Sequence, residues 1–169
     1  MILSYIKFKE KLKMAQINRK HWIIRVNDGI NFKNSKYPFW GVKRGKNNAI
    51  KTIVSKIKVN DVLWFMTSKL YGGKLIGMCE YTGFYDRQDE PLIQVNILSN
   101  AEQGWIGNDD WDIQLQYKNL YNTEKQNIIA CIQCSATILD YDTFKHKIEG
   151  DLDEHYINFK FYAEPKKID

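Results

Sequence analysis

The sequence is poor in cysteine, histidine and proline, with only three of each among its 169 residues. The three cysteines, Cys79, Cys131 and Cys134, are odd in number and give no disulfide framework, which indicates a reducing intracellular compartment. Cys131 and Cys134 form an isolated C-x-x-C pair, but a structural zinc site needs four ligands. We therefore expect buried packing cysteines and no metal.

The sequence also lacks long apolar runs. None approaches the roughly 20 residues that span a bilayer, and four lysines interrupt the N-terminal apolar stretch, at positions 7, 9, 11 and 13. We therefore expect a protein that neither spans a membrane nor is secreted.

Familiar catalytic motifs are missing as well. The chain has no glycine-rich phosphate loop, no nucleophile elbow and no paired histidines at metal spacing. We expect no enzymatic activity and no cofactor. The alternative is a metal-dependent nuclease site built from two acidic clusters, which consist of Asp86, Asp89, Glu90, Asp109, Asp110 and Asp112.

Positive charge, in contrast, is abundant in the first third of the chain. Residues 1–60 hold 15 Lys or Arg against only Glu10 and Asp28, whereas the remaining 109 residues hold 10 against 18. Clustered cations favour a polyanionic partner, because they release the counterions condensed on phosphates. The asymmetry predicts a nucleic-acid partner, and the alternative is a solvated basic surface.

The length and the apolar pattern predict a basic N-terminal arm over residues 1–20 and one domain over residues 21–169. A strand over His21–Val26 leads into a turn at residues 27–29. A helix of about three turns then begins at Asn47 or Asn48, which would cap it. The further predicted elements are a hairpin of strands 62–66 and 75–81, an edge strand over 91–98, a half-exposed strand over 111–117, a last strand within 128–139, and helices after Asp142 and near Tyr156.

Several strands with few, short helices predict an α+β fold. We expect a curved or partly closed mixed sheet, an open barrel, flanked by helices.

The five tryptophans divide into two groups. Trp22 and Trp64 lie within apolar strands, where packing is the expected role. Trp40 and Trp105 lie in polar, loop-like surroundings, and we expect their indoles to be exposed for a ligand. Trp111 begins a strand and fits either role. Two indoles suit an unstacked base, because stacking contributes about 1–3 kcal/mol per base.

Several short motifs, in their order and spacing, resemble the EVE domain, a member of the PUA-like superfold related to YTH domains. The resemblance covers roughly residues 20–140. The motifs are His21–Asn27, Phe39-Trp40-Gly41-Val42, Asp61-Val62-Leu63-Trp64-Phe65, Ile76-Gly77-Met78-Cys79-Glu80, and Trp105 followed by Trp111-Asp112-Ile113-Gln114-Leu115.

This resemblance implies a reader of modified bases. YTH domains hold a methylated adenine in a tryptophan cage, whose positions match Trp40 and Trp105, with Trp111 as a possible third wall. Base-edge contacts would come from Asn27, Asp28 and Gly41, helped by Asn47 or Asn48. EVE domains are similar modules for modified bases in DNA, so N6-methyladenine and 5-methylcytosine, and RNA and DNA, all stay open.

A second PUA-like group, the ASCH ribonucleases, has a motif of the form G-x-K-x-x-x-E-x-R. Gly41-Val42-Lys43 matches its beginning, but Asn47 and Ala49 stand at the acidic and arginine positions. The motif therefore fails.

The sequence hypothesis is that Trp40 and Trp105 clamp one extruded base while cations hold the phosphates. The candidate phosphate-binding residues are Lys43, Arg44, Lys46, Lys69 and Lys74. The alternative is a protein-interaction module in which the tryptophans are buried.

Overall fold

The computed structural model describes residues 2–89, 97–107, 110–133 and 135–167. In these residues six strands form one sheet in the order β2-β5-β4-β3-β1-β6, in which only β1 and β3 run parallel. The strands are β1 His21–Arg25, β2 Phe39–Val42, β3 Val62–Met66, β4 Leu75–Asp86, β5 Ile113–Asn122 and β6 Ile138–Asp140. The fold is therefore α+β with a mixed sheet.

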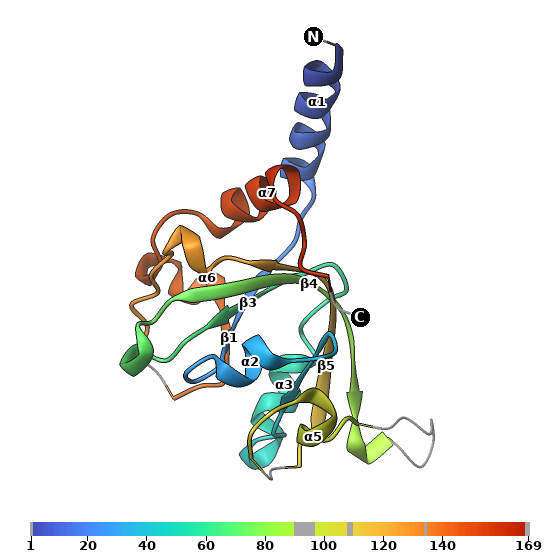
Figure 1. Ribbon diagram of the computed structural model, residues 1–169, viewed down its shortest axis with the longest axis vertical. Helices are drawn as coiled ribbons and strands as arrows, with labels where there is room; N and C mark the ends of the chain where they lie inside the picture. The colour runs from blue at the N-terminus through green and yellow to red at the C-terminus, as the bar shows by residue number, and fades with distance from the viewer. Residues whose placement is uncertain (1, 90–96, 108–109, 134, 168–169) are drawn as a thin grey trace.

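The sheet curls into part of a barrel (Figure 1). The register between the two longest strands, β4 and β5, shifts between Met78 and Glu80 and again between Tyr81 and Gly83. Such bulges bend and twist a strand pair. The expected curved sheet is confirmed in these terms.

Short helices cover both faces of the sheet. Figure 1 shows α2, α3 and α5 on one side and α6 and α7 on the other. The α-helices are α1 Ile2–Gln16, α2 Ile30–Asn34, α3 Ala49–Val54, α5 Asn100–Gln103, α6 Tyr141–Phe144 and α7 Leu152–Tyr162. Single 3₁₀ turns lie at Lys46–Asn48, Lys69–Tyr71, Arg87–Asp89, Glu124–Gln126 and Lys145–Lys147.

Two hydrophobic cores lie on the two faces. Along β1, Trp22 and Ile24 belong to the core under α2 and α3, whereas Ile23 belongs to the core under α6 and α7. Trp64 lies in the second core. A strand covered on both faces is apolar throughout, which explains the uninterrupted apolar runs. The packing roles predicted for Trp22 and Trp64 are confirmed.

The helix predicted to begin at Asn47 or Asn48 is shorter than expected. Both asparagines have positive φ, 56° and 59°, and belong to a tight turn before the six-residue α3. Asn48 occupies the N-cap position, but its side chain makes no capping hydrogen bond. Ile57, although buried, follows the end of the helix.

Two strand predictions also need correction. β5 begins at Ile113 instead of Trp111. Gln114 was predicted to face water, but its side chain accepts a hydrogen bond from the Leu98 N–H and the residue is only 3% exposed. The last strand is only β6, while Ile129 and Ala130 form isolated bridges. Most of the predicted edge strand over 91–98 lies outside the described residues. The hairpin and the two C-terminal helices are confirmed.

Helix α1 occupies the predicted N-terminal arm. It buries no residue and stands beside α7, away from the sheet (Figure 1). Lys11 in α1 donates a hydrogen bond to Asn158 in α7 at 3.2 Å. In the described part of the chain, no helix combines the length and apolar character needed to cross a bilayer.

Candidate functional site

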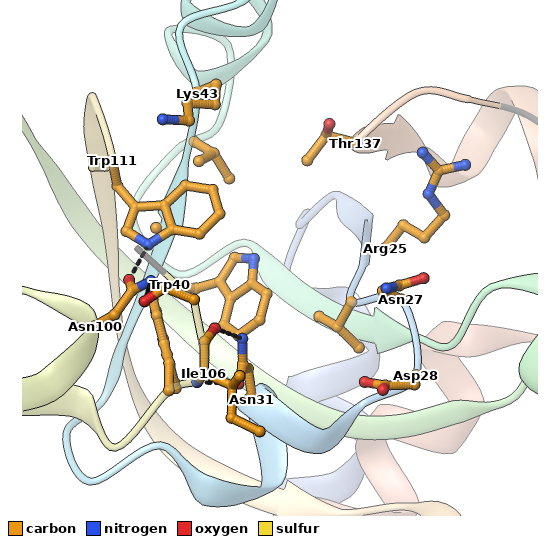
Figure 2. Close-up of a pocket in the computed structure, with 15 residues that line it drawn as sticks. Arg25, Asn27, Asp28, Asn31, Trp40, Lys43, Asn100, Ile106, Trp111 and Thr137 are labelled. Carbon is orange, nitrogen blue, oxygen red and sulfur yellow. Dashed lines mark hydrogen bonds between the residues drawn. The ribbon is translucent and has the colours of Figure 1, made fainter. Parts of the chain in front are cut away.

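Three tryptophans from separate segments meet at one open cavity of about 330 Å³. Trp40 comes from β2, Trp105 follows α5, and Trp111 precedes β5, which pairs with β2. In Figure 2, Trp40 and Trp111 form one side of the cavity, while Arg25, Asn27, Asp28 and Thr137 lie across it. The structure thus brings together the three tryptophans singled out from the sequence.

Their arrangement differs from the expected clamp. The Trp40 and Trp105 rings contact each other, with centroids 4.8 Å apart and planes at 57°, which leaves no slot between them for a base. They are 8% and 7% exposed, so the expectation of exposed loop indoles was wrong. The reason is that Trp40 lies in a strand and packs edge-on against Phe32 and Phe65.

Side-chain hydrogen bonds hold the segment that carries Trp105 and Trp111. The Trp105 indole N–H donates to Ser35 Oγ at 2.7 Å, and the Trp111 indole N–H donates to Asn100 Oδ1 at 2.6 Å. The buried amide of Gln103 accepts from the Tyr37 N–H and donates to the Phe39 carbonyl. The aromatic wall is therefore fixed in place without a ligand.

Gly41 allows Trp111 to lie directly on β2. A Cβ atom at Gly41 would be only 2.4 Å from Trp111 Cγ. A larger residue would displace the indole from the cavity wall. Gly41 thus lines the site, as the resemblance implied, and its backbone serves as the floor beneath Trp111.

Four polar groups around the cavity have no intramolecular partner among the described residues. They are the Trp40 indole N–H, the Asn27 amide, the Thr137 hydroxyl and Asp28 Oδ2. The other Asp28 oxygen accepts from the Ile30 N–H at 3.0 Å. Figure 2 shows the Trp40 nitrogen turned toward the open side. The cavity thus offers donors and acceptors to a ligand.

The predicted phosphate-binding residues do not all lie together. Lys43 lines the cavity, with its ammonium group 5.4 Å from the centre of the Trp111 ring. Lys69 lines a separate cavity near Cys131. Lys46, Lys74, Asn47 and Asn48 line neither cavity.

Arg44 is committed to an internal ion pair. Its guanidinium and the ammonium of Lys51 both bind Asp86, whose side chain is 3% exposed. Hydrogen bonds from Arg44, opposed by burial and helped by Lys51, hold the pKa of Asp86 well below its usual range. Arg44 therefore ties the end of β4 to the segment that follows β2 rather than lining the cavity.

The acidic clusters considered for a nuclease site also form internal contacts with Arg44, through Asp86 and Asp112. Asp112 Oδ2 accepts from the Arg44 N–H at 2.9 Å. Glu90, Asp109 and the Asp89 side chain lie outside the described residues, as does Cys134. Among the residues that are described, no three side chains of His, Cys, Asp or Glu gather as a metal site would require.

Sequence reasoning missed several residues that line the cavity, which are Arg25, Asn31, Asn100, Ile106, Gly107 and Thr137. Arg25 ends β1, so its position beside the predicted turn was the signal that could have found it. Asn31, Asn100 and Thr137 carried no signal, because the sequence is rich in asparagine and their proximity depends on chain segments far apart.

Comparison with known proteins gives no functional assignment. No family model and no curated protein matches this chain. Among solved structures, a hypothetical protein from Leishmania major is 12% identical, covers 85% of this chain and 95% of its own, and has a TM-score of 0.39. A protein from Pseudomonas putida is 10% identical, with coverages of 87% and 91% and a TM-score of 0.35.

Proposed function

We propose that this chain is a PUA-like, EVE-related module that binds nucleic acid and holds one modified base, methylated adenine or cytosine, in the cavity beside Trp40 and Trp111. One observation carries the proposal: a preformed aromatic cavity contains an indole N–H, that of Trp40, with no intramolecular partner among the described residues. The resemblance to EVE domains led to the same three tryptophans independently of the cavity.

The cavity suits a base in size and chemistry. At about 330 Å³ it lies at the small end of ligand sites, which combine apolar walls with a few polar groups. The Trp40 N–H can donate to a ring nitrogen or carbonyl of the base. Asp28 Oδ2 can accept from an exocyclic amine, as carboxylates do from cytosine. A methyl group would lie against the indoles.

Charge around the cavity favours a polynucleotide over a free base. Lys43 and Arg25 lie on opposite sides of the opening (Figure 2). The Arg25 guanidinium donates to the Ser135 carbonyl at 2.6 Å, which fixes its position. Cations at these positions bind the phosphates on either side of a captured nucleotide and set its orientation.

A protein-interaction module is the competing function. The low exposure of Trp40 and Trp105 agrees with it, as do the exposed apolar side chains of α1, among them Leu3, Tyr5 and Phe8. It provides no role for the unpartnered groups of the cavity. Binding of oligonucleotides separates the two functions.

Replacing Trp40 with phenylalanine tests the base pocket. The ring keeps most of the packing against Phe32 and Phe65 but loses the N–H. We expect binding of a methylated single-stranded oligonucleotide to weaken about fivefold, the value of one net hydrogen bond. Fluorescence anisotropy should measure it with methylated adenine, methylated cytosine and unmodified strands of RNA and DNA at two salt concentrations.

Trp22→Phe is the matched control, because the Trp22 indole is also buried but donates to Asp61 and does not line the cavity. It should leave binding unchanged. In the wild type, one methylated strand should bind roughly 10–200-fold more tightly than its unmodified counterpart. Equal, steeply salt-dependent binding of all strands would contradict the pocket and leave only a basic surface.

A further inference from the structure

Ile106 is an exposed aliphatic residue at the rim of the cavity. Its side chain is 74% exposed, although it directly follows the buried Trp105 and lines the same cavity. Figure 2 shows it beside Asn31 and below Trp40. Single exposed aliphatic residues are common on protein surfaces, so exposure by itself assigns it no role.

The backbone of Ile106 is held unusually firmly for a loop residue. The side-chain amide of Asn31 forms hydrogen bonds with both backbone groups of Ile106. It donates to the Ile106 carbonyl at 3.2 Å and accepts from the Ile106 N–H at 2.9 Å. On either side, the Trp105 N–H donates to the Asn100 carbonyl, and Asn100 Nδ2 donates to the Gly107 carbonyl at 3.0 Å. The loop cannot draw Ile106 inward without breaking these bonds.

Ile106 thus presents an exposed apolar side chain from a fixed backbone beside the proposed base pocket. In this it resembles the apolar wedges that DNA-binding proteins insert between bases. A nucleotide whose base enters the cavity loses its stacking partner, and its neighbour must cross the rim. Apolar surface presented there replaces the lost stacking. Because the backbone is already fixed, binding costs little additional ordering.

We propose that Ile106 packs against the base adjacent to the one in the cavity, so that the site takes at least two consecutive nucleotides rather than a single nucleoside. This inference rests on the proposed function. It identifies the ligand class as a strand whose target base is unstacked from its neighbour.

The experiment compares a modified nucleoside with a trinucleotide that carries the same base in its centre, at high salt to suppress phosphate contacts. For wild type we expect the trinucleotide to bind about tenfold more tightly than the nucleoside, because burying a few aliphatic carbons contributes that much binding free energy. Ile106→Ser should remove most of this gain, so that the ratio of trinucleotide affinity to nucleoside affinity falls toward one. Ile106→Phe, which offers a larger flat surface, should restore it or increase it.

Val59→Ser is the matched control. Val59 is 61% exposed, precedes β3 and does not line the cavity. Both ligands should bind this variant like wild type. Because Ile106 and Val59 are exposed, neither change should lower the melting temperature, which differential scanning fluorimetry checks.

The outcomes separate the two proposals. If the nucleoside binds and Trp40→Phe weakens it, but Ile106→Ser binds the trinucleotide like wild type, the role of Ile106 is overturned and the pocket stands. If neither ligand binds, or if Trp40→Phe has no effect on either, both proposals are overturned. Loss of trinucleotide affinity in Val59→Ser as well would also overturn the assignment to Ile106.

Discussion

Gly41→Ala is expected to weaken binding of a methylated oligonucleotide roughly tenfold to a hundredfold, the value of stacking one base on an aromatic side chain. The new Cβ would stand 2.4 Å from Trp111 Cγ, so the indole must leave its place over β2. Its hydrogen bond to Asn100 is then lost. Overpacking of this kind costs about 1–3 kcal/mol of folding free energy, so denaturation curves should accompany the affinity measurements.

A double-mutant cycle isolates the cause. If Gly41 acts only by allowing Trp111 to occupy the wall, Gly41→Ala should add nothing to the loss caused by Trp111→Ala. Full additivity of the two effects on affinity would show that Gly41 contacts the ligand through its own backbone. Unchanged affinity in both single variants would exclude Trp111 from the pocket.

Asp86→Asn is expected to lower the free energy of unfolding by about 3 kcal/mol. Removing one partner of a buried ion pair leaves the other charges uncompensated, which costs about 3–5 kcal/mol. Partial solvent contact of Arg44 and Lys51 favours the lower end. Asp140→Asn is the control, because its pair with Lys20 is half-exposed and should contribute at most about 1 kcal/mol.

The pH dependence of this difference follows from the pKa of Asp86. The folded pKa lies below the unfolded value of about 3.9, because Arg44 and then Lys51 bind the carboxylate against the effect of burial. The stabilisation is therefore complete above that value and is lost as the pH falls through the folded pKa. Chemical denaturation should show wild type and Asp86→Asn converging in acid. A constant difference down to low pH would contradict the pairing.

Local pattern predicted much of the sheet. The apolar run from His21 and the hairpin of strands 62–66 and 75–81 follow from side-chain periodicity and turn chemistry, which depend on neighbours in the chain. Predictions were wrong where tertiary contacts decide. Gln114 is buried because a loop 16 residues away donates to it, and two left-handed asparagines shorten the helix expected at residue 47.

The candidate site was predictable in composition but not in geometry. Trp40, Trp105 and Trp111 could be selected as aromatic residues near polar segments. That Trp40 and Trp105 touch each other depends on β2 pairing with β5 and on the packing of Phe32, which a single sequence does not reveal. Arg44 illustrates the same limit, because a basic run predicts charge while Asp86, 42 residues away, determines how that charge is used.

The segment with Trp105 and Trp111 is fastened by the neutral amides of Asn31, Asn100 and Gln103. Carboxamides do not titrate, and their hydrogen bonds are little affected by dissolved ions. The shape of the cavity should therefore persist across acidity and ionic strength, while the attraction of a polyanion toward Lys43 and Arg25 declines as salt is added. Selectivity for the base would then change little with pH and salt, whereas the overall affinity for the polyanion would fall as salt is added.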